Sequence, residues 1–160
     1  MANSKKTLII TGLADKLFSQ SSFLKNKNED LLIIPASLES LKSQPYGCTV
    51  RNIILAVYSE NVDKMYFIGE KNSGIHKVNG EEMVLKIQQS GVSNEVIQAI
   101  ECMKVVEGSL SSWLTESEEI EKVIIETIQM MKTHPLLPKT VSIYGGVINK
   151  ETGEFEKVCY

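Results

Sequence analysis

One apolar run that passes into a glycine-bounded polar loop constrains this chain more than any other feature. The run is Met65–Ile68, and consecutive apolar residues with aromatics among them are typical of a strand covered on both faces. Gly69 is expected to end this strand, and Gly74 to close the loop behind it. Because open α/β sheets place their ligands beyond the carboxyl ends of their strands, this loop is the first candidate for a functional site.

Similar runs and helical periodicities alternate along the rest of the chain. The expected strands are 7–11, 31–34, 65–68 and 140–148, with an antiparallel edge strand at 154–158. The expected helices are 13–24, 49–58, 79–89, 93–103 and 115–131. Strands separated by helices predict an α/β fold: a single domain, residues 1–160, with a mainly parallel four-stranded sheet flanked by helices. The predicted strand order is second, first, third, fourth.

Turn and capping residues predict where these elements begin and end. Thr49 is expected to cap the helix that follows it, and Thr115 with Glu118 resembles a capping box for the last helix. Residues 36–47 are expected to be irregular, and 108–114 to form a loop or short turn that carries Trp113 as a core or interface anchor. The pair Gly145-Gly146 predicts a bulge or bend in the fourth strand.

Composition excludes several classes of protein. The chain has 160 residues and a net charge of −3, and it has no basic stripe with interleaved aromatics, which argues against a nucleic-acid partner. No apolar run approaches the ~20 residues of a membrane span, and Met1–Lys6 lacks the apolar core of a signal peptide. A cytoplasmic protein is therefore expected. The cysteines and histidines form no recognisable metal motif; they are Cys48, Cys102, Cys159, His76 and His134.

Taken alone, the residues give weak catalytic signals. Glu70, directly after the buried strand, is either a general base or an ion-paired loop carboxylate. Lys16 and Lys71 are either binders of a small anion or exposed loop charges. His134 is expected to pack beside the turn at Pro135.

The order of several short motifs resembles the β-class carbonic anhydrases over nearly the whole chain from Lys5. The matching segments are Pro45-Tyr46-Gly47, Arg51–Tyr58, Ile68-Gly69 with Gly74, Trp113, His134–Pro138, Val141–Gly145 and Thr152–Phe155. The resemblance implies the fold described above and, from the family, a zinc-dependent hydration of carbon dioxide. It also implies a homodimer, for which Leu31–Ile34 and the Cys159-Tyr160 tail supply apolar surface.

The chain departs from this family after the first strand, where members carry Cys-x-Asp-x-Arg. This motif falls on residues 12–16, so Gly12 replaces the zinc-binding Cys, Ala14 the Asp and Lys16 the Arg. Asp15 is one residue out of register and does not restore the Asp–Arg pair.

The second departure lies in the loop behind the third strand, where members carry His-x-x-Cys-Gly. Glu70 replaces the His and Ser73 the Cys, and Gly74 is kept. Two thiolates and an imidazole suit tetrahedral zinc, whereas glycine donates nothing and serine offers a neutral hydroxyl. The resemblance therefore predicts a catalytically inactive homologue that binds neither zinc nor another cofactor. Removing the ion predicts that Glu70 pairs with Lys16, with Lys71 or Asn72 as substitutes.

Three functions remain open at this stage. The first is a catalytically inactive carbonic anhydrase-like protein with a binding or regulatory role. The second is an enzyme with different chemistry, in which Glu70 acts as acid or base. The third is a working carbonic anhydrase with substitute zinc ligands such as Cys48 or His76.

Overall fold

The computed structural model describes residues 4–13, 15–25, 29–71, 78–106, 108–115 and 119–160. The chain divides into two compact units. The first unit holds residues 1–72 and 119–160, and the second holds residues 73–118.

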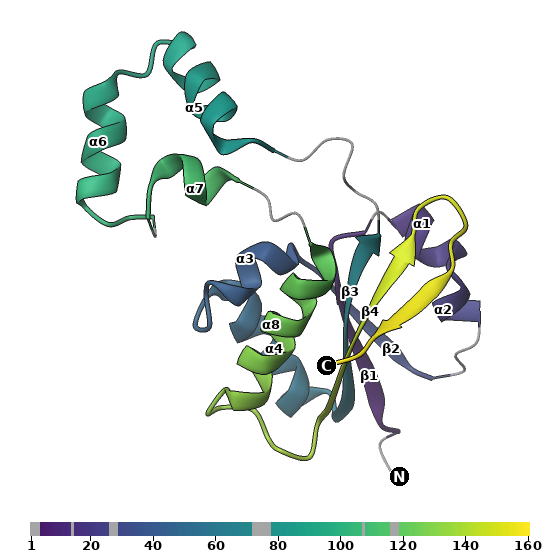
Figure 1. The fold of residues 1–160 in the computed structure, drawn as a ribbon. Coiled ribbons are helices and arrows are strands. Elements are labelled where there is room, and N and C mark those ends of the chain that lie inside the picture. Colours follow the sequence, from purple (N-terminus) through teal and green to yellow (C-terminus); the bar gives the residue numbers. More distant parts are fainter. Residues whose placement is uncertain (1–3, 14, 26–28, 72–77, 107, 116–118) are drawn as a thin grey trace. The chain divides into compact units, whose positions relative to one another are not determined.

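A five-stranded sheet forms the centre of the first unit. Its strands are β1 (Lys6–Thr11), β2 (Leu31–Pro35), β3 (Val62–Lys71), β4 (Ser142–Asn149) and β5 (Phe155–Val158). They lie in the order β2-β1-β3-β4-β5, and only the β4–β5 pair is antiparallel. The predicted strand order, the parallel sheet and the antiparallel edge strand are confirmed (Figure 1).

Helices cover both faces of this sheet. One face carries α3 (Leu38–Lys42), α4 (Cys48–Ser59) and α8 (Ile120–Thr133), and the other carries α1 (Asp15–Gln20) and α2 (Ser22–Lys25) (Figure 1). Strand β3 serves both faces, because successive side chains of a strand point to opposite sides. Met65 and Phe67 lie in the larger core cluster, and Ile68 lies in the smaller one. All three side chains are fully buried, as the opening apolar run predicts.

The helical stripes read from the sequence become the buried faces of α4 and α8. On α4 the buried side chains are Val50, Ile53 and Val57. On α8 they are Val123, Ile124, Thr127, Ile128 and Met131. These two faces pack into the larger cluster, which fixes the helices against the sheet.

The glycine pair of β4 does not form the predicted bulge. The β3–β4 register runs without a shift through Gly145 and Gly146. Both glycines are needed for packing instead. A Cβ atom on Gly145 would lie 2.3 Å from Ile124 of α8, and one on Gly146 would lie 2.1 Å from the ring of Phe155.

Several predicted boundaries are corrected by pairing and capping. Strand β3 does not end at Gly69; it continues to Lys71, because its last residues pair with Val147–Asn149 of β4. The segment 36–47 holds the short helix α3, and the predicted helix 13–24 is two short helices. Gly47, not Thr49, is the N-cap of α4.

The second unit consists of α5 (Gly80–Gln89), α6 (Asn94–Cys102) and α7 (Leu110–Leu114). Asn79 caps α5 by accepting hydrogen bonds from two backbone N–H groups. The predicted loop at 108–114 contains α7, which Thr115 ends rather than opening the next helix. Trp113 on α7 is 56% exposed, so it is not a core anchor of this unit.

Glu119 is the N-cap residue of α8, and its side chain makes no capping hydrogen bond. Of the predicted capping box, Glu118 lies outside the described residues. No helix in the described part of the chain is long and apolar enough to cross a membrane.

Candidate functional site

The candidate site lies at the carboxyl edge of the sheet, where β1 and β3 end side by side. Thr11 pairs with Ile68 across these strands, so Gly12 and the residues after Ile68 reach the same edge. The buried Thr11 hydroxyl donates a hydrogen bond of 2.8 Å to the Ile68 carbonyl and accepts one of 3.2 Å from the Leu13 N–H. Thr11 therefore positions the turn that follows β1. Sequence reasoning did not single out this residue.

Gly12 is exposed, and it lies close to the backbone behind β2. A Cβ atom at this position would lie 3.1 Å from the carbonyl oxygen of Ala36, which is tight but can be relieved by a small shift. Gly12 therefore provides no side-chain atom that could bind a metal, and the space for a larger side chain at this position is limited.

Glu70 extends from the penultimate position of β3 toward the β4–β5 turn. Its carboxylate lies 3.6 Å from the ammonium group of Lys150, and its side chain is 28% exposed. The predicted Glu70–Lys16 pair is wrong: Lys16 is exposed on α1, and the ion pair that Glu70 makes within the described residues is the one with Lys150. The sequence did not predict this partner, because Lys150 reaches this edge only through the return of β4 and β5 to the sheet.

Lys71 is held on the opposite face of β3 by β5. Its ammonium group donates a hydrogen bond of 2.5 Å to the Glu156 carboxylate, and this bond raises the pKa of Lys71 above its ordinary value. The charge of Lys71 is therefore paired with a carboxylate, which argues against the alternative in which Lys71 binds a small anion. Ala14, Asn72, Ser73, Gly74 and His76 lie outside the described residues.

The cysteines lie away from metal-ligand partners within the described ranges. Cys48, Cys102 and Cys159 are free and exposed. Cys48 lines a cavity of about 100 Å³ at the start of α4, whose other lining residues are Ser40, Leu41, Gln44, Gly47 and Thr49. No group of three Cys, His, Asp or Glu side chains suited to a metal occurs among the residues that the structure describes.

His134 is buried as predicted, at 3% exposure, beside the turn that follows α8. Its Nε2 lies 2.7 Å from the Pro45 carbonyl, and its Nδ1 accepts a hydrogen bond of 3.2 Å from the Leu136 N–H. An accepting Nδ1 assigns the hydrogen to Nε2. Both ring nitrogens are used in holding two loops together, which is a structural role.

Two Bacillus subtilis proteins are similar in sequence to this chain over almost its full length. The chain is 28% identical over 158 residues to the Bacillus subtilis protein named "Putative carbonic anhydrase YvdA", covering 97% of this chain and 77% of that protein. It is 29% identical over 155 residues to "Putative carbonic anhydrase YtiB" of the same organism, covering 96% and 81%. No model of a protein family matches the chain.

Solved structures of β-carbonic anhydrases have a similar fold. The β-carbonic anhydrase isoform I of Trichomonas vaginalis superimposes with a TM-score of 0.74 at 18% identity, covering 95% of this chain and 81% of that one. The chain is therefore similar in sequence to proteins named as putative carbonic anhydrases, and it has the fold of a β-carbonic anhydrase.

Proposed function

We propose that this carbonic anhydrase-like protein does not hydrate carbon dioxide through zinc and acts instead as a binding or regulatory protein. The observation that carries the proposal is the Glu70–Lys150 ion pair of 3.6 Å at the edge of the sheet. Glu70 stands where family members place the imidazole ligand. A carboxylate that is engaged with an ammonium group is a poorer metal ligand than a free one, because the metal must replace that cation.

The chemistry of the remaining donor positions supports the proposal. Gly12 has no donor atom, and Ser73 supplies a neutral hydroxyl in place of a thiolate. Zinc in proteins takes thiolate, imidazole and carboxylate ligands, and catalysis needs it to lower the pKa of a bound water to near 7. One carboxylate does not make such a site, so the residues present do not fit the family metal.

Metal content and hydration activity test the proposal directly. The purified chain is expected to contain no stoichiometric zinc and to show hydration no faster than the buffer background. Metal analysis after zinc loading and dialysis, with a stopped-flow hydration assay, measures both. Zinc retained at one per chain through chelator treatment would contradict the proposal and point to substitute ligands.

Restoring the ligands tests whether the scaffold is otherwise intact. The triple variant Gly12→Cys, Glu70→His and Ser73→Cys is expected to bind zinc much more tightly than any single variant, because each ligand alone leaves the coordination incomplete. The new side chain at position 12 must displace the Ala36 carbonyl slightly. A matched control, Gly12→Ser with Glu70→His, adds similar volume without thiolates and is expected to leave zinc affinity low.

Hydration should need two further changes. Ala14→Asp and Lys16→Arg return the pair that orients the zinc-bound hydroxide in the family. We expect activity above background only in the variant with all five changes. Tight zinc binding without any gain in activity would show that more than the ligands and this pair was remodelled.

The alternative of a different enzyme in which Glu70 acts as acid or base makes a separate prediction. Glu70→Gln would abolish such an activity while leaving the fold unchanged, because the side chain is partly exposed. The ion pair with Lys150 gives Glu70 a structural partner and favours the non-catalytic function.

A further inference from the structure

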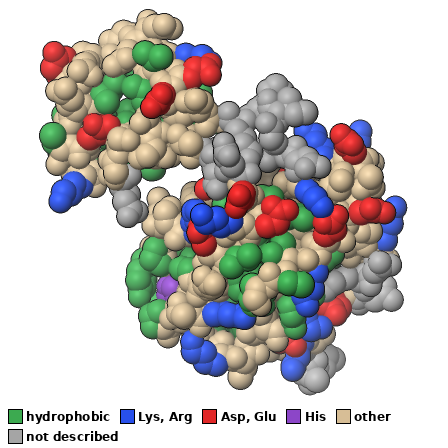
Figure 2. All heavy atoms as spheres, viewed as in Figure 1, with side chains coloured by type: hydrophobic (Ala, Val, Ile, Leu, Met, Phe, Trp, Pro, Cys, Tyr) green, Lys and Arg blue, Asp and Glu red, His purple; other side chains and the backbone are tan. Residues whose placement is uncertain are grey.

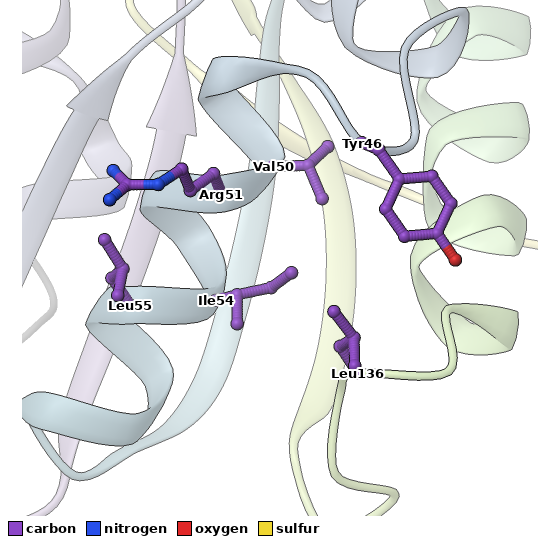
Figure 3. A pocket seen from close by; sticks show the side chains of 6 residues that line it. All are labelled: Tyr46, Val50, Arg51, Ile54, Leu55 and Leu136. Atoms are coloured by element: carbon purple, nitrogen blue, oxygen red, sulfur yellow. The ribbon is translucent and has the colours of Figure 1, made fainter.

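A cavity beside α4 in the first unit shares no lining residue with the candidate site at the carboxyl edge. Its volume is about 260 Å³. The residues that line it are Tyr46, Val50, Arg51, Ile54, Leu55 and Leu136 (Figure 3). Figure 2 shows hydrophobic side chains gathered on the surface of this unit over the region of α4 and the end of α8. Exposed apolar side chains around a hollow indicate a binding site.

The cavity has an apolar floor and two sides. Val50 is buried, and Ile54 lies one helical turn further along α4. Tyr46 and Leu136 lie on one side of these two residues, and Leu55 lies on the other (Figure 3). Leu55 and Leu136 are each about half exposed, at 50% and 51%. An apolar group placed between them would therefore cover surface that now faces water, which is favourable.

The side that carries Tyr46 and Leu136 is held in place by the buried ring of His134. This ring bonds the Pro45 carbonyl through Nε2 and the Leu136 N–H through Nδ1, so it joins the two loops. The rings of Tyr46 and His134 are in contact, with centroids 5.0 Å apart. The Tyr58 hydroxyl donates a hydrogen bond of 2.9 Å to the Leu136 carbonyl. A wall that is already formed lowers the entropy cost of binding a ligand.

Arg51 is the charged residue among those that line the cavity. Its side chain is exposed on the same side of α4 as Leu55, and it makes no ion pair among the described residues (Figure 3). A guanidinium group is always charged, and its planar fork matches a carboxylate in a bidentate manner. The cavity therefore suits a ligand with an apolar body and one anionic end.

The volume and the charge limit the class of ligand. Sites for drug-sized molecules measure about 300–1,000 Å³, so a cavity of about 260 Å³ suits a smaller one. A single guanidinium matches one negative charge, whereas a phosphate monoester carries nearly two at neutral pH. A carboxylate on a short apolar chain satisfies both limits.

We propose that this cavity binds a short-chain carboxylic acid as its anion, with the carboxylate on Arg51 and the apolar chain between Tyr46 and Leu136. The inference goes beyond the proposed function. It holds whether or not the chain binds zinc, because none of the proposed ligand contacts involves the carboxyl edge.

Probes of one length and different charge test the ligand class. Hexanoate is expected to bind at least tenfold more tightly than hexan-1-ol or hexylammonium in calorimetric titrations, because only hexanoate pairs with Arg51. Backbone amide shifts in nuclear magnetic resonance should change around Tyr46, Val50 and Leu136 and not in the second unit. Equal affinities for the three probes, or shifts confined to other parts of the chain, would overturn the proposal.

Two variants separate the roles of charge and apolar surface. Arg51→Gln is expected to reduce hexanoate affinity at least tenfold and to leave hexan-1-ol within twofold. Lys25→Gln, an exposed cation on α2 at the other face of the sheet, is the matched control and should change neither. Leu136→Ser should weaken both probes. Urea unfolding verifies that the variants keep their fold, and hexanoate binding that Arg51→Gln leaves intact would contradict the assignment.

A peptide that ends in a free leucine carboxylate offers the same chemistry from another source. The proposal expects such a peptide to bind no more tightly than hexanoate, because the cavity has room only for its last side chain. Much tighter binding of the peptide that depends on Arg51 would assign the cavity to a protein C-terminus and overturn the proposal, as would the absence of hexanoate binding at millimolar concentration.

Discussion

At the scale of single residues, the absence of a side chain allows α8 to approach β4. A Cβ atom at Gly145 would lie 2.3 Å from Cγ2 of Ile124 and 2.8 Å from Cδ1 of Ile128, and both isoleucines are fully buried. Closely packed cores respond to added atoms by shifting backbone or leaving preferred rotamers. The glycine is thus required by a neighbouring helix and not by its own backbone conformation.

Gly145→Ala is therefore expected to destabilise the protein. The added methyl group overpacks the contact with α8, at a cost of about 1–3 kcal/mol. Urea unfolding followed by circular dichroism measures the change.

A double-mutant cycle provides the control for Gly145→Ala. Ile124→Ala alone leaves a cavity, but the double variant should cost less than the sum of the two single variants, because each change relieves the other. Simple additivity would show that the strain does not come from Ile124.

A second residue-scale prediction concerns His134. His134→Ala removes the partner of the Pro45 carbonyl and of the Leu136 N–H in a buried position, so we expect a loss of about 1–3 kcal/mol. His134→Gln keeps one acceptor and one donor and should lose less. Equal losses for the two variants in urea unfolding would contradict a role through hydrogen bonding.

At the scale of elements, an ion pair joins the short helix α3 to α8. The Lys42 ammonium group donates a hydrogen bond of 2.8 Å to the Glu126 carboxylate. This bond is the main cause that lowers the pKa of Glu126 below its ordinary value of 4.5. Because α3 has only five residues, it depends on such tertiary contacts more than on its own helix propensity.

The pair predicts a pH dependence with a defined sign. A lowered pKa in the folded state means that the contribution of Glu126 is fully present above pH 4.5 and is lost as the pH falls through the lower, folded value. Both side chains are partly exposed, so the contribution is at most about 0.5 kcal/mol.

Lys42→Met is the variant that measures this contribution. The free energy of unfolding of the variant should be slightly lower than that of the wild type near neutral pH, and the difference should vanish in acid. Lys139→Met is the matched control, because Lys139 bonds a backbone carbonyl and, among the described residues, no carboxylate. A difference that grows in acid would contradict the assignment.

At the scale of the whole molecule, the two units contribute unequally to the hydrophobic core. Both core clusters consist of residues of the first unit. In the second unit the buried apolar side chains among the described residues are Ile97 and Leu110. A small unit with so few buried side chains has little apolar burial to offset its conformational entropy.

We therefore expect the first unit to fold without the second. Replacing residues 73–118 by a short Gly-Ser linker should keep the sheet, since β3 and the start of α8 are already in contact: a Cβ atom on Gly69 would lie 2.4 Å from the side chain of Ile120. Circular dichroism and a cooperative urea transition would verify the fold. A peptide of residues 73–118 should be largely unfolded, and a cooperative transition in that peptide would contradict the expectation.

Sequence patterns predicted most of the individual strands and helices, because these elements depend on local features. Runs such as Met65–Ile68 mark strands buried on two faces, and the stripe on α8 marks a helix with one buried face. The strand order was predicted from the alternation of strands and helices together with the order of the motifs that resemble β-carbonic anhydrases. The strand and helix patterns are visible in the sequence because burial requires apolar side chains at fixed intervals.

The features that the sequence did not predict depend on contacts between segments that are distant in the chain. The Lys150 partner of Glu70, the α8 side chains that require Gly145, and the pairing that extends β3 to Lys71 all arise when β4 and β5 return to the sheet. Each depends on the distance between residues far apart in sequence, and no local pattern records such a distance. The sequence by itself therefore determined the strands and helices, while the tertiary structure decided which charges meet at the carboxyl edge of the sheet.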